Sequence, residues 1–242
     1  MIKKSLLESV IQKYYLDENE SVKWSIVNNI LNVDFTSKTK EIIGFITCEN
    51  ILLEDCELAI YDTKKLLNLL KITEEDLQIH FEKNQHLVSK MFISDSNYEL
   101  VYALADPILI GKNGTVNEPE WDVVLPLSKT NIEHLIKAKS ALSEATNMLI
   151  TYENTLKQPT IVFTFGDEQG HNNKINYSVP TEKYTGKLKL PFNAIMFKNI
   201  LASNKDLNDC VLCINSKGLL KFTFKSAEIN SVYYLVRKEN NI

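Results

Sequence analysis

The stretch LAIYDTKKLLNLLKI, Leu58 to Ile72, contains the pattern on which the predicted fold depends. Its first four residues are typical of a β-strand, and the remainder has the spacing of a short amphipathic helix. At about 100° per residue, one side of this helix is apolar and the other is basic. The apolar side consists of Leu66, Leu67, Leu69 and Leu70. The basic side consists of Lys64, Lys65, Asn68 and Lys71, and no acidic residue shares it.

Similar units of strand and helix recur along the chain. Helices are predicted to begin near Ile2, Asp62, Lys129 and Phe192, at intervals of 60, 67 and 63 residues. Such a regular interval indicates internal duplication. Ser128 is the predicted N-cap of the third helix. Pro191 lies near the start of the fourth helix, where its missing N–H costs little.

The segments between these helices are rich in β-branched and aromatic residues, as β-strands are. In the first half they include VKWSIVN (22–28), ILNVDFT (30–36), EIIGFIT (41–47), DLQIHFEK (76–83) and YELVYALA (98–105). In the second half they include WDVVLPL (121–127), NMLITYE (147–153), TIVFTFG (160–166), KINYSV (174–179) and LLKFTFK (219–225). Helices that alternate with several strands, twice per half, predict an α+β fold with two pseudo-symmetric domains. Each domain would pack two helices on antiparallel sheets.

A polar segment between the two halves is the predicted linker. DPILIGKNGTVNEPE, residues 106–120, contains two prolines and two glycines. We therefore expect an N-terminal domain at residues 1–107, a connector at 108–120 and a C-terminal domain at 121–242. A chain of 242 residues is long enough for two domains of ordinary size.

Composition excludes several classes of protein. The chain is 44% hydrophobic and 24% charged, as globular proteins are. No apolar run approaches the roughly 20 residues needed to cross a bilayer, so we expect no membrane partner. Glu8, Gln12 and Lys13 interrupt the apolar N-terminal segment, which argues against a signal peptide. We therefore expect a cytoplasmic protein, in a host cell if the chain is viral.

The residues of common catalytic and metal sites are missing. The sequence has no glycine-rich phosphate loop, no HExxH and no GxSxG, and only 7 glycines. Cys210 and Cys213 have metal-like spacing, but residues three apart in a strand point to opposite faces, so we expect a buried apolar pair. The four histidines are scattered, and Asp167 and Glu168 are interpreted as part of a hairpin turn. We expect no enzyme, no cofactor and no metal.

Four segments together carry a resemblance to a known family. They are ELAIYDTKKLLNLL (57–70), ALADP (103–107), SKTNIEHLIKA (128–138) and NYSV (176–179), the last followed by KYTG (183–186). In order, spacing and length, over nearly the whole chain, they resemble the DNA sliding clamps, or polymerase processivity factors, of tailed phages. More distantly they resemble the proliferating cell nuclear antigen fold. The N-terminal segment, predicted to start directly in a helix, departs from the eukaryotic-type pattern.

The resemblance implies a function and an assembly. Clamps of this family form head-to-tail homotrimers, in which two domains per subunit close a ring whose helices line a central hole. Such a ring encircles duplex DNA without sequence specificity and tethers the replicative DNA polymerase, which raises the effective concentration of the enzyme at the template. The implied partners are double-stranded DNA, the polymerase and an ATP-driven clamp loader.

Lysines recur on the predicted helices. The expected DNA-binding residues are Lys4, Lys13, Lys64, Lys65, Asn68, Lys71, Lys137, Lys139, Lys198 and Lys205. A single lysine on a helix is usually a solvated surface residue. Their recurrence in a chain with 31 acidic and 27 basic residues implies an acidic exterior around a basic hole. No segment resembles a recognition helix that presents Arg or Asn to bases, so we expect contacts with phosphates only.

By resemblance, two strand edges would join neighbouring subunits, and a pocket near the connector would take partner peptides. The expected interface residues are Asn97, Tyr98, Leu100, Tyr102, Lys174, Ile175, Tyr177 and Val179. Alternatively, Tyr98, Leu100 and Tyr102 pack inside their own sheet. The pocket candidates are Leu109, Ile110 and Trp121, which could equally be buried linker anchors.

Two other functions are consistent with the sequence. The first is an internally duplicated, β-rich viral structural or scaffold protein with no DNA role, whose lysines only face solvent. The second is a small nuclease, which metal-dependent DNA cleavage would reveal. The molecular mass in solution separates a trimeric clamp from a monomer that is indifferent to DNA.

Overall fold

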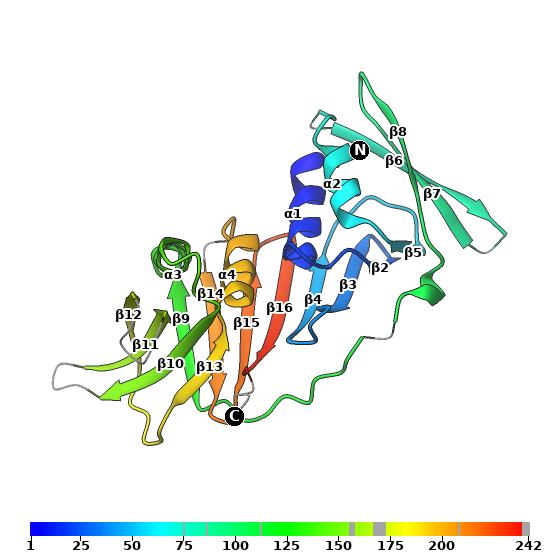
Figure 1. Cartoon of the computed structure of the whole chain (residues 1–242). Helices are drawn as coiled ribbons and strands as arrows, with labels where there is room; N and C mark the ends of the chain where they lie inside the picture. The colour runs from blue at the N-terminus through cyan, green and yellow to red at the C-terminus, as the bar shows by residue number, and fades with distance from the viewer. Residues whose placement is uncertain are drawn as a thin grey trace. The chain divides into compact units, whose positions relative to one another are not determined.

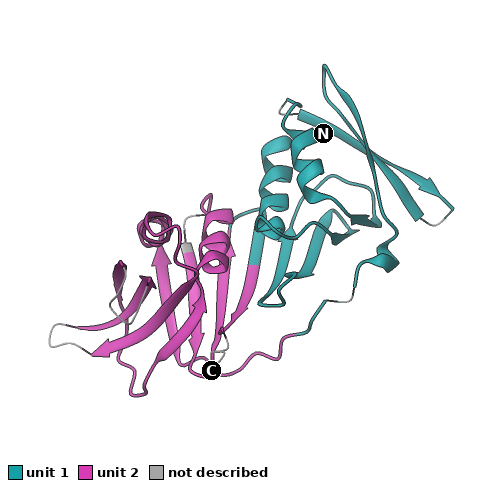
Figure 2. Cartoon of the chain, in the orientation of Figure 1, with its two compact units in different colours: residues 1–115, 226–231 teal, residues 116–225, 232–242 magenta. Residues whose placement is uncertain are grey.

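The chain forms two compact units (Figure 2). The computed structural model describes residues 1–74, 76–85, 87–111, 113–154, 158–166, 173–207 and 209–238. Unit 1 comprises Met1–Thr115 and Ser226–Ser231, and unit 2 comprises Val116–Lys225 and Val232–Ile242. The boundary between Thr115 and Val116 falls inside the segment 108–120 that we propose as the connector. Each unit combines two α-helices with antiparallel strands, which confirms the predicted α+β fold.

In unit 1, two helices pack beside antiparallel sheets (Figure 1). Its elements are β1 (Ile2–Lys3), α1 (Lys4–Tyr15), β2 (Val22–Val27), β3 (Ile30–Thr36), β4 (Ile42–Cys48), β5 (Cys56–Ile60), α2 (Thr63–Leu70), β6 (Asp76–Asn84), β7 (Leu87–Ser94), β8 (Glu99–Ala103) and the 3-10 helix η1 (Pro107–Leu109). One sheet has the strand order β1-β6-β7-β8, and β5-β2-β3-β4 are neighbours in another. Strand β8 is therefore an edge strand.

The N-terminus differs from the prediction of a helix from Ile2. Residues Ile2 and Lys3 form a short strand that pairs with Leu77 and Asp76 of β6, and α1 begins at Lys4. Ile2 is buried in this pairing, because a strand places its side chain against the core while Lys3 points to solvent. The alternation of one buried and one exposed residue is too short to be recognised in a sequence.

Unit 2 repeats the plan of unit 1. Its elements are β9 (Val123–Ser128), α3 (Lys129–Ala141), β10 (Asn147–Asn154), β11 (Pro159–Gly166), β12 (Lys174–Pro180), β13 (Lys189–Asn193), α4 (Ala194–Ser203), β14 (Asp209–Asn215), β15 (Leu219–Lys225) and β16 (Ile229–Val236), whose first residues belong to unit 1. One sheet has the order β12-β11-β10-β13, and β16-β15-β14-β9 are neighbours in another. Strand β12 is thus also an edge strand.

Side-chain caps set the starts of three helices. The Asp62 carboxylate accepts the N–H of Lys65 at 2.8 Å and begins α2. Ser128 and Asn131 form a capping box at α3, as the sequence predicted for Ser128. Helix α4 begins two residues later than predicted, because the Asn193 side chain accepts the N–H groups of Ile195 and Met196.

The later start of α4 moves two predicted helix residues into a strand. Pro191 and Phe192 belong to β13, where they pair with Leu149 and Met148 of β10. Ala194, the first residue of α4, is buried. The apolar run from Leu190 is compatible with either structure, so the cap and not the periodicity decides where the helix begins.

Several smaller features bear on the sequence analysis. Cys210 and Cys213 are buried, free cysteines, and Gly218 has φ 104° in the turn between β14 and β15. The predicted turn residues Asp167 and Glu168, and the histidines at 86 and 171, lie outside the described residues. Within the described residues, no cluster of His, Cys, Asp or Glu could hold a metal ion. In the same part of the chain, no helix is long and apolar enough to span a bilayer.

Candidate nucleic-acid interface

Helix α2 presents the basic face that its sequence predicted. Leu66 and Leu70 are fully buried, whereas Lys64, Lys65, Asn68 and Lys71 are exposed. Lys71 donates to the Asn68 side chain at 3.1 Å. Among the described residues, neither Lys64 nor Lys65 forms an ion pair with a carboxylate, so both ammonium groups are available to an anionic ligand. Two carboxylates bind the backbone at the start of this helix: Asp62 accepts the N–H of Lys65 at 2.8 Å, and Oε2 of Glu20 accepts the N–H of Lys64 at 3.2 Å.

The two lysines expected on α1 have structural roles. Lys4 donates to the carbonyl oxygens of Thr73 at 2.6 Å and Lys71 at 3.4 Å, which lie just after α2. Its ammonium group also lies 4.0 Å from a carboxylate oxygen of Glu8. Lys4 therefore satisfies carbonyls at the C-terminal end of α2 and connects the two helices.

Lys13 is fully buried, so the expectation that it contacts DNA is wrong for this chain as folded. Its Nζ donates to the Ser9 hydroxyl at 2.9 Å, within the same helix. The buried side of α1 also contains Val10, Ile11 and Tyr14, so it is wider than a single stripe and includes residue 13. A phosphate group outside the protein cannot reach this ammonium group.

Lys139 of α3 is buried as well, against expectation. Its Nζ donates to the carbonyl oxygens of Leu142 at 3.2 Å and Ser143 at 3.1 Å, and so caps the end of the helix. Burial lowers the pKa of Lys139, and the neighbouring charge of Lys198 lowers it further. A lysine in the last turn is a common cap, and this role removes Lys139 from the candidate DNA-binding set.

The remaining lysines of unit 2 are accessible. Lys137 on α3 and Lys205 after α4 are exposed, and Lys198 on α4 is half-buried. We call Lys64, Lys65, Lys71, Lys137, Lys198 and Lys205 the helix lysines. Four of the ten residues first expected to bind DNA are thus not in this set: two lysines are buried, Lys4 holds carbonyls, and Asn68 is uncharged.

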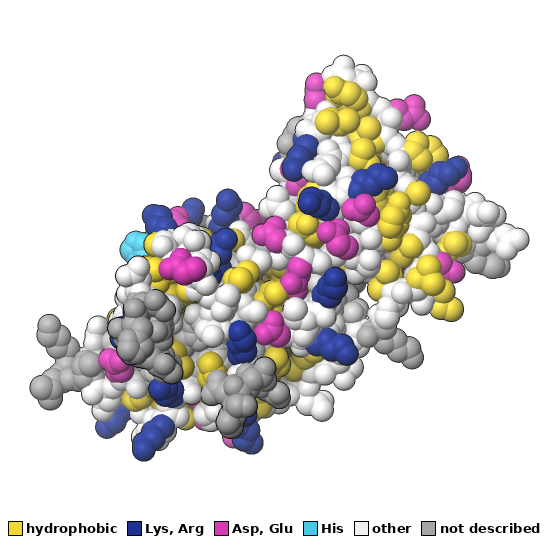
Figure 3. All heavy atoms as spheres, viewed as in Figure 1, with side chains coloured by type: hydrophobic (Ala, Val, Ile, Leu, Met, Phe, Trp, Pro, Cys, Tyr) yellow, Lys and Arg dark blue, Asp and Glu magenta, His cyan; other side chains and the backbone are white. Residues whose placement is uncertain are grey.

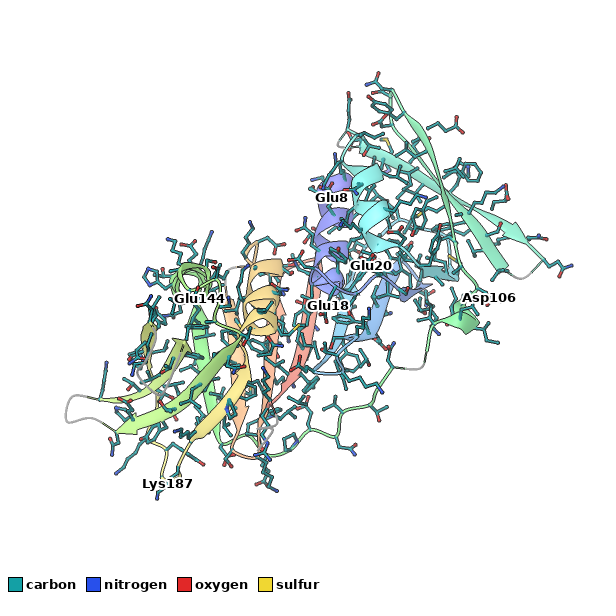
Figure 4. The ribbon with its side chains drawn as sticks, viewed as in Figure 1. Glu8, Glu18, Glu20, Asp106, Glu144 and Lys187 are labelled. Carbon is teal, nitrogen blue, oxygen red and sulfur yellow. The ribbon has the colours of Figure 1, made fainter. Side chains whose placement is uncertain are left out.

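Acidic residues are not excluded from the helical surface. Glu8 lies on α1, and Glu18 and Glu20 follow it (Figure 4). Glu133 is exposed on α3, beside the lysines of that helix. On the face shown in Figure 3, lysines and carboxylates are interspersed. Acidic side chains therefore share the surfaces of α1 and α3 with lysines, whereas the exposed face of α2 has none.

The edge strand β8 carries the first half of the expected subunit interface. Tyr98 is 46% exposed and Val101 is 52% exposed, while Asn97 lies in the turn before the strand. Leu100 is half-buried. Tyr102 is buried, and its hydroxyl contacts Asp62, so it packs inside its own unit.

The edge strand β12 carries the second half. Lys174 is exposed, and Ile175 and Tyr177 are half-buried. The Tyr177 hydroxyl accepts from the Asn131 amide at 2.9 Å and lies 3.3 Å from Nδ1 of His134, so it attaches the strand to α3. Val179 is buried in its own unit.

A cavity of about 580 Å³ lies in unit 1 beside the expected connector, and Leu109 and Ile110 line it. This volume is within the range of roughly 300–1,000 Å³ typical of ligand sites. Tyr61, Lys38 and Lys40 also line the cavity and were not among the predicted residues. The two lysines stand in the polar turn TSKTKE (36–41) between two strands, which is the signal that could have identified them.

Trp121 belongs to unit 2 and is not among the residues that line this cavity. Its side chain lies near Glu118, whose pKa is lowered chiefly by hydrogen bonds from Lys221 and then Tyr234. The Lys221 ammonium group also lies 5.8 Å from the centre of the Tyr234 ring. This arrangement matches the alternative interpretation of Trp121 as a linker anchor.

Solved structures of proliferating cell nuclear antigens have the same fold. The antigen from Entamoeba histolytica has a TM-score of 0.76 at 14% identity, over 98% of this chain and 96% of that one. The A. fulgidus antigen, solved with the C-terminal region of FEN-1 bound, has a TM-score of 0.77 at 11% identity, over 100% of this chain and 98% of that one. A chain of the PCNA2–PCNA3 complex from Sulfolobus tokodaii has a TM-score of 0.75 at 11% identity, over 98% of each chain.

These matches establish the DNA clamp fold for the whole chain. No family model and no curated protein sequence matches the chain. At identities of 11–14%, the likeness concerns the fold, and the function has to be argued from the surfaces described above.

Proposed function

We propose that this chain, which has the fold of the proliferating cell nuclear antigens, is a sliding clamp for duplex DNA of the type found in tailed phages. The observation that carries the proposal is the structural match over nearly the full length of both this chain and the matched chains. The exposed lysines on α2, α3 and after α4 support it further, because both units offer cations on their helices. A scaffold protein that does not bind DNA would not need lysines on the helices of both units.

The helix lysines would contact the phosphate backbone. A lysine ammonium group is a compact charge on a flexible stem, so it can exchange one phosphate for the next. Contacts of this kind are independent of sequence, weaken with salt and permit sliding. Retention on DNA would come from the closed ring, so tight binding is not required.

We propose that the ring is a homotrimer that closes by strand pairing between copies. Strands β8 and β12 are both edge strands, and an unpaired edge is an association site. Pairing β8 of one copy with β12 of the next is a heterologous contact, which closes into a ring at the correct rotation. Tyr98, Leu100, Lys174, Ile175 and Tyr177 remain the proposed contacts, whereas Tyr102 and Val179 support the edges from inside.

The connector cavity is the proposed docking site for partners, with Leu109 and Ile110 as its apolar contacts. The partners would be the replicative DNA polymerase and an ATP-driven clamp loader. Docking of a polymerase to a topologically linked ring would turn its dissociation into a rare event, because the tether keeps its effective concentration high. In this role the chain itself performs no chemistry.

Retention on circular DNA tests the function directly. The chain is loaded on a nicked plasmid with its loader and ATP, and the DNA-bound fraction is measured by gel filtration at high salt before and after one restriction cut. A clamp stays bound to the circle and leaves the linear DNA by sliding off its ends. A protein that binds the circle and the linear form equally, or neither, is not a sliding clamp.

A further inference from the structure

The connector cavity combines apolar side chains with a basic rim. Leu109 is 74% exposed and Tyr61 is 41% exposed, although both line a concave surface. Large apolar groups in a concave site favour burial by a ligand. Lys38 and Lys40 extend from the turn between β3 and β4 and are exposed at the same cavity.

The backbone at Lys40 is held in a conformation that favours glycine. Its φ is 60°, in the left-handed region, where a residue with a Cβ costs of order 1 kcal/mol more than glycine. The Lys40 N–H donates to the Ser37 carbonyl at 2.8 Å, and the Ser37 hydroxyl accepts the N–H of Ile42 at 3.0 Å. These bonds fix the turn and so fix where the Lys40 side chain leaves the backbone. A lysine at a position suited to glycine points to a use for its charge.

Neighbouring acids only partly balance these two lysines. Asp34 lines the same cavity; burial raises its pKa, and the charge of Lys23 acts in the opposite direction. Glu18 has its pKa raised by burial and by Glu41, and lowered by Lys38. Within the described residues, neither Lys38 nor Lys40 forms an ion pair with a carboxylate. The ammonium groups of Lys38 and Lys40 at the rim are therefore available to an anionic ligand.

We propose that this cavity selects a partner segment in which carboxylates flank an apolar anchor. The anchor would bury the exposed surfaces of Leu109 and Tyr61. Lys38 and Lys40 would bind the carboxylates that flank it. The inference rests on the proposed docking role of the cavity and adds the chemistry of the partner to it. Because the lysines lie at a solvated rim, their effect on affinity is modest and sensitive to salt.

Three fluorescent synthetic peptides test this inference by anisotropy with the full-length chain. All three share the same leucine and phenylalanine anchors, and their flanks are glutamate, glutamine or lysine. We expect the glutamate peptide to bind tighter than the glutamine peptide by roughly two- to fivefold, the scale of exposed ion pairs. We expect the lysine peptide to bind most weakly, and the differences to shrink at high salt.

Three variants locate the preference. Lys40→Gly removes the charge and suits the turn, so it should keep or increase stability while lowering the preference for glutamate. Lys38→Gln should lower it as well. Lys217→Gln is the matched control, because Lys217 is exposed in the hairpin after β14 in unit 2 and should leave the preference unchanged.

The outcomes separate the two levels of the proposal. Equal binding of all three peptides, abolished by Leu109→Ser, would keep the docking site and overturn the charge selection. Binding of none would overturn both, although the plasmid test of the clamp would still stand by itself. A preference for glutamate that survives in Lys40→Gly and Lys38→Gln would also overturn the assignment to this rim.

Discussion

The hydroxyl of Tyr102 on β8 lies 2.9 Å from the carbonyl oxygen of Asp62, the residue that caps α2. The same hydroxyl accepts the N–H of Asp62 at 3.1 Å. An edge strand is thus attached to the start of the helix that presents Lys64 and Lys65. In the proposed ring, β8 meets the next copy and α2 meets DNA, so one side chain holds both surfaces in a fixed arrangement.

Tyr102→Phe should destabilise unit 1 by about 1–3 kcal/mol, because both backbone groups of Asp62 lose their buried partner. Tyr61→Phe is the control, since Tyr61 is 41% exposed and stacks on Tyr102 without these bonds. It should change the free energy of unfolding by no more than about 0.5 kcal/mol. Urea titrations followed by circular dichroism measure both variants. Equal stability of the two variants would mean that the Tyr102 bonds contribute nothing.

The same tyrosine predicts a loss of stability at alkaline pH. Burial raises the pKa of Tyr102 to about 12 from an ordinary value of 10.0. Its stabilising contribution is complete below pH 10 and is lost as the pH rises towards 12, because the unfolded chain releases this proton first. The wild-type chain should therefore lose more stability than Tyr102→Phe over this interval. Parallel losses in the two proteins would assign the alkaline transition to other tyrosines.

Reversing the charge of four helix lysines should abolish processivity. In the variant, Lys64, Lys65, Lys137 and Lys198 are each replaced by glutamate. The carboxylates would repel phosphates, so the run length of the polymerase on primed circular DNA should fall to that without clamp. The mass from light scattering should remain that of a trimer, because these residues lie on helices and not on β8 or β12.

A matched variant controls for net charge. In it, the exposed lysines Lys183, Lys187, Lys217 and Lys225, which lie outside the helices, are replaced by glutamate. Processivity should be reduced little by this change. If both variants were equally active, or equally inactive, the helix lysines would not be the DNA-binding set.

Ring closure should depend on the exposed side chains of β8 and of Tyr98, the residue just before it. Tyr98→Lys combined with Val101→Lys adds charge to an edge strand that would pair with β12, near Lys174 of the next copy. We expect a shift from trimer towards monomer in light scattering at micromolar concentration, with the monomer still folded. Val124→Lys with Val211→Lys is the control, because these valines are 54% and 40% exposed on β9 and β14. If the β8 variant remained a trimer while the control variant dissociated, the interface would lie elsewhere.

Local patterns in the sequence were sufficient to predict the fold. Contacts between residues far apart in the sequence could not be predicted from them. The periodicity of residues 63–70 and the cap at Ser128 depend on neighbours in sequence, so the helices α2 and α3 could be predicted with their faces. The carbonyl that Lys4 binds belongs to Thr73, 69 residues away. Nothing near Lys4 in the sequence identifies that partner.

The errors in the candidate site have the same origin. Lys13 flanks the polar side of α1, and an angular position at such a boundary does not say whether another element covers it. Lys139 continues the buried side of α3 that Ile132 and Leu135 form, because the helix extends to Ala141. The structure shows that both are covered. The cavity at Leu109 depends on residues from the start of β2 to the connector, and only folding brings these together. Tyr61, at the end of the quoted strand, was therefore overlooked.

Acidification should release the anchor at Trp121. The pKa of Glu118 is lowered chiefly by its hydrogen bonds from Lys221 and Tyr234. A carboxyl group with a lowered pKa stabilises the folded state above its ordinary value of 4.5, and this contribution is lost as the pH falls through the lowered value. Trp121 is half-buried beside this group, whereas the other tryptophan, Trp24, is fully buried. Below pH 4.5 the Trp121 emission should shift to longer wavelength while far-UV circular dichroism is unchanged. Glu118→Gln should show the shifted emission at neutral pH and no acid transition, and an unaltered transition in this variant would assign it to another carboxyl group.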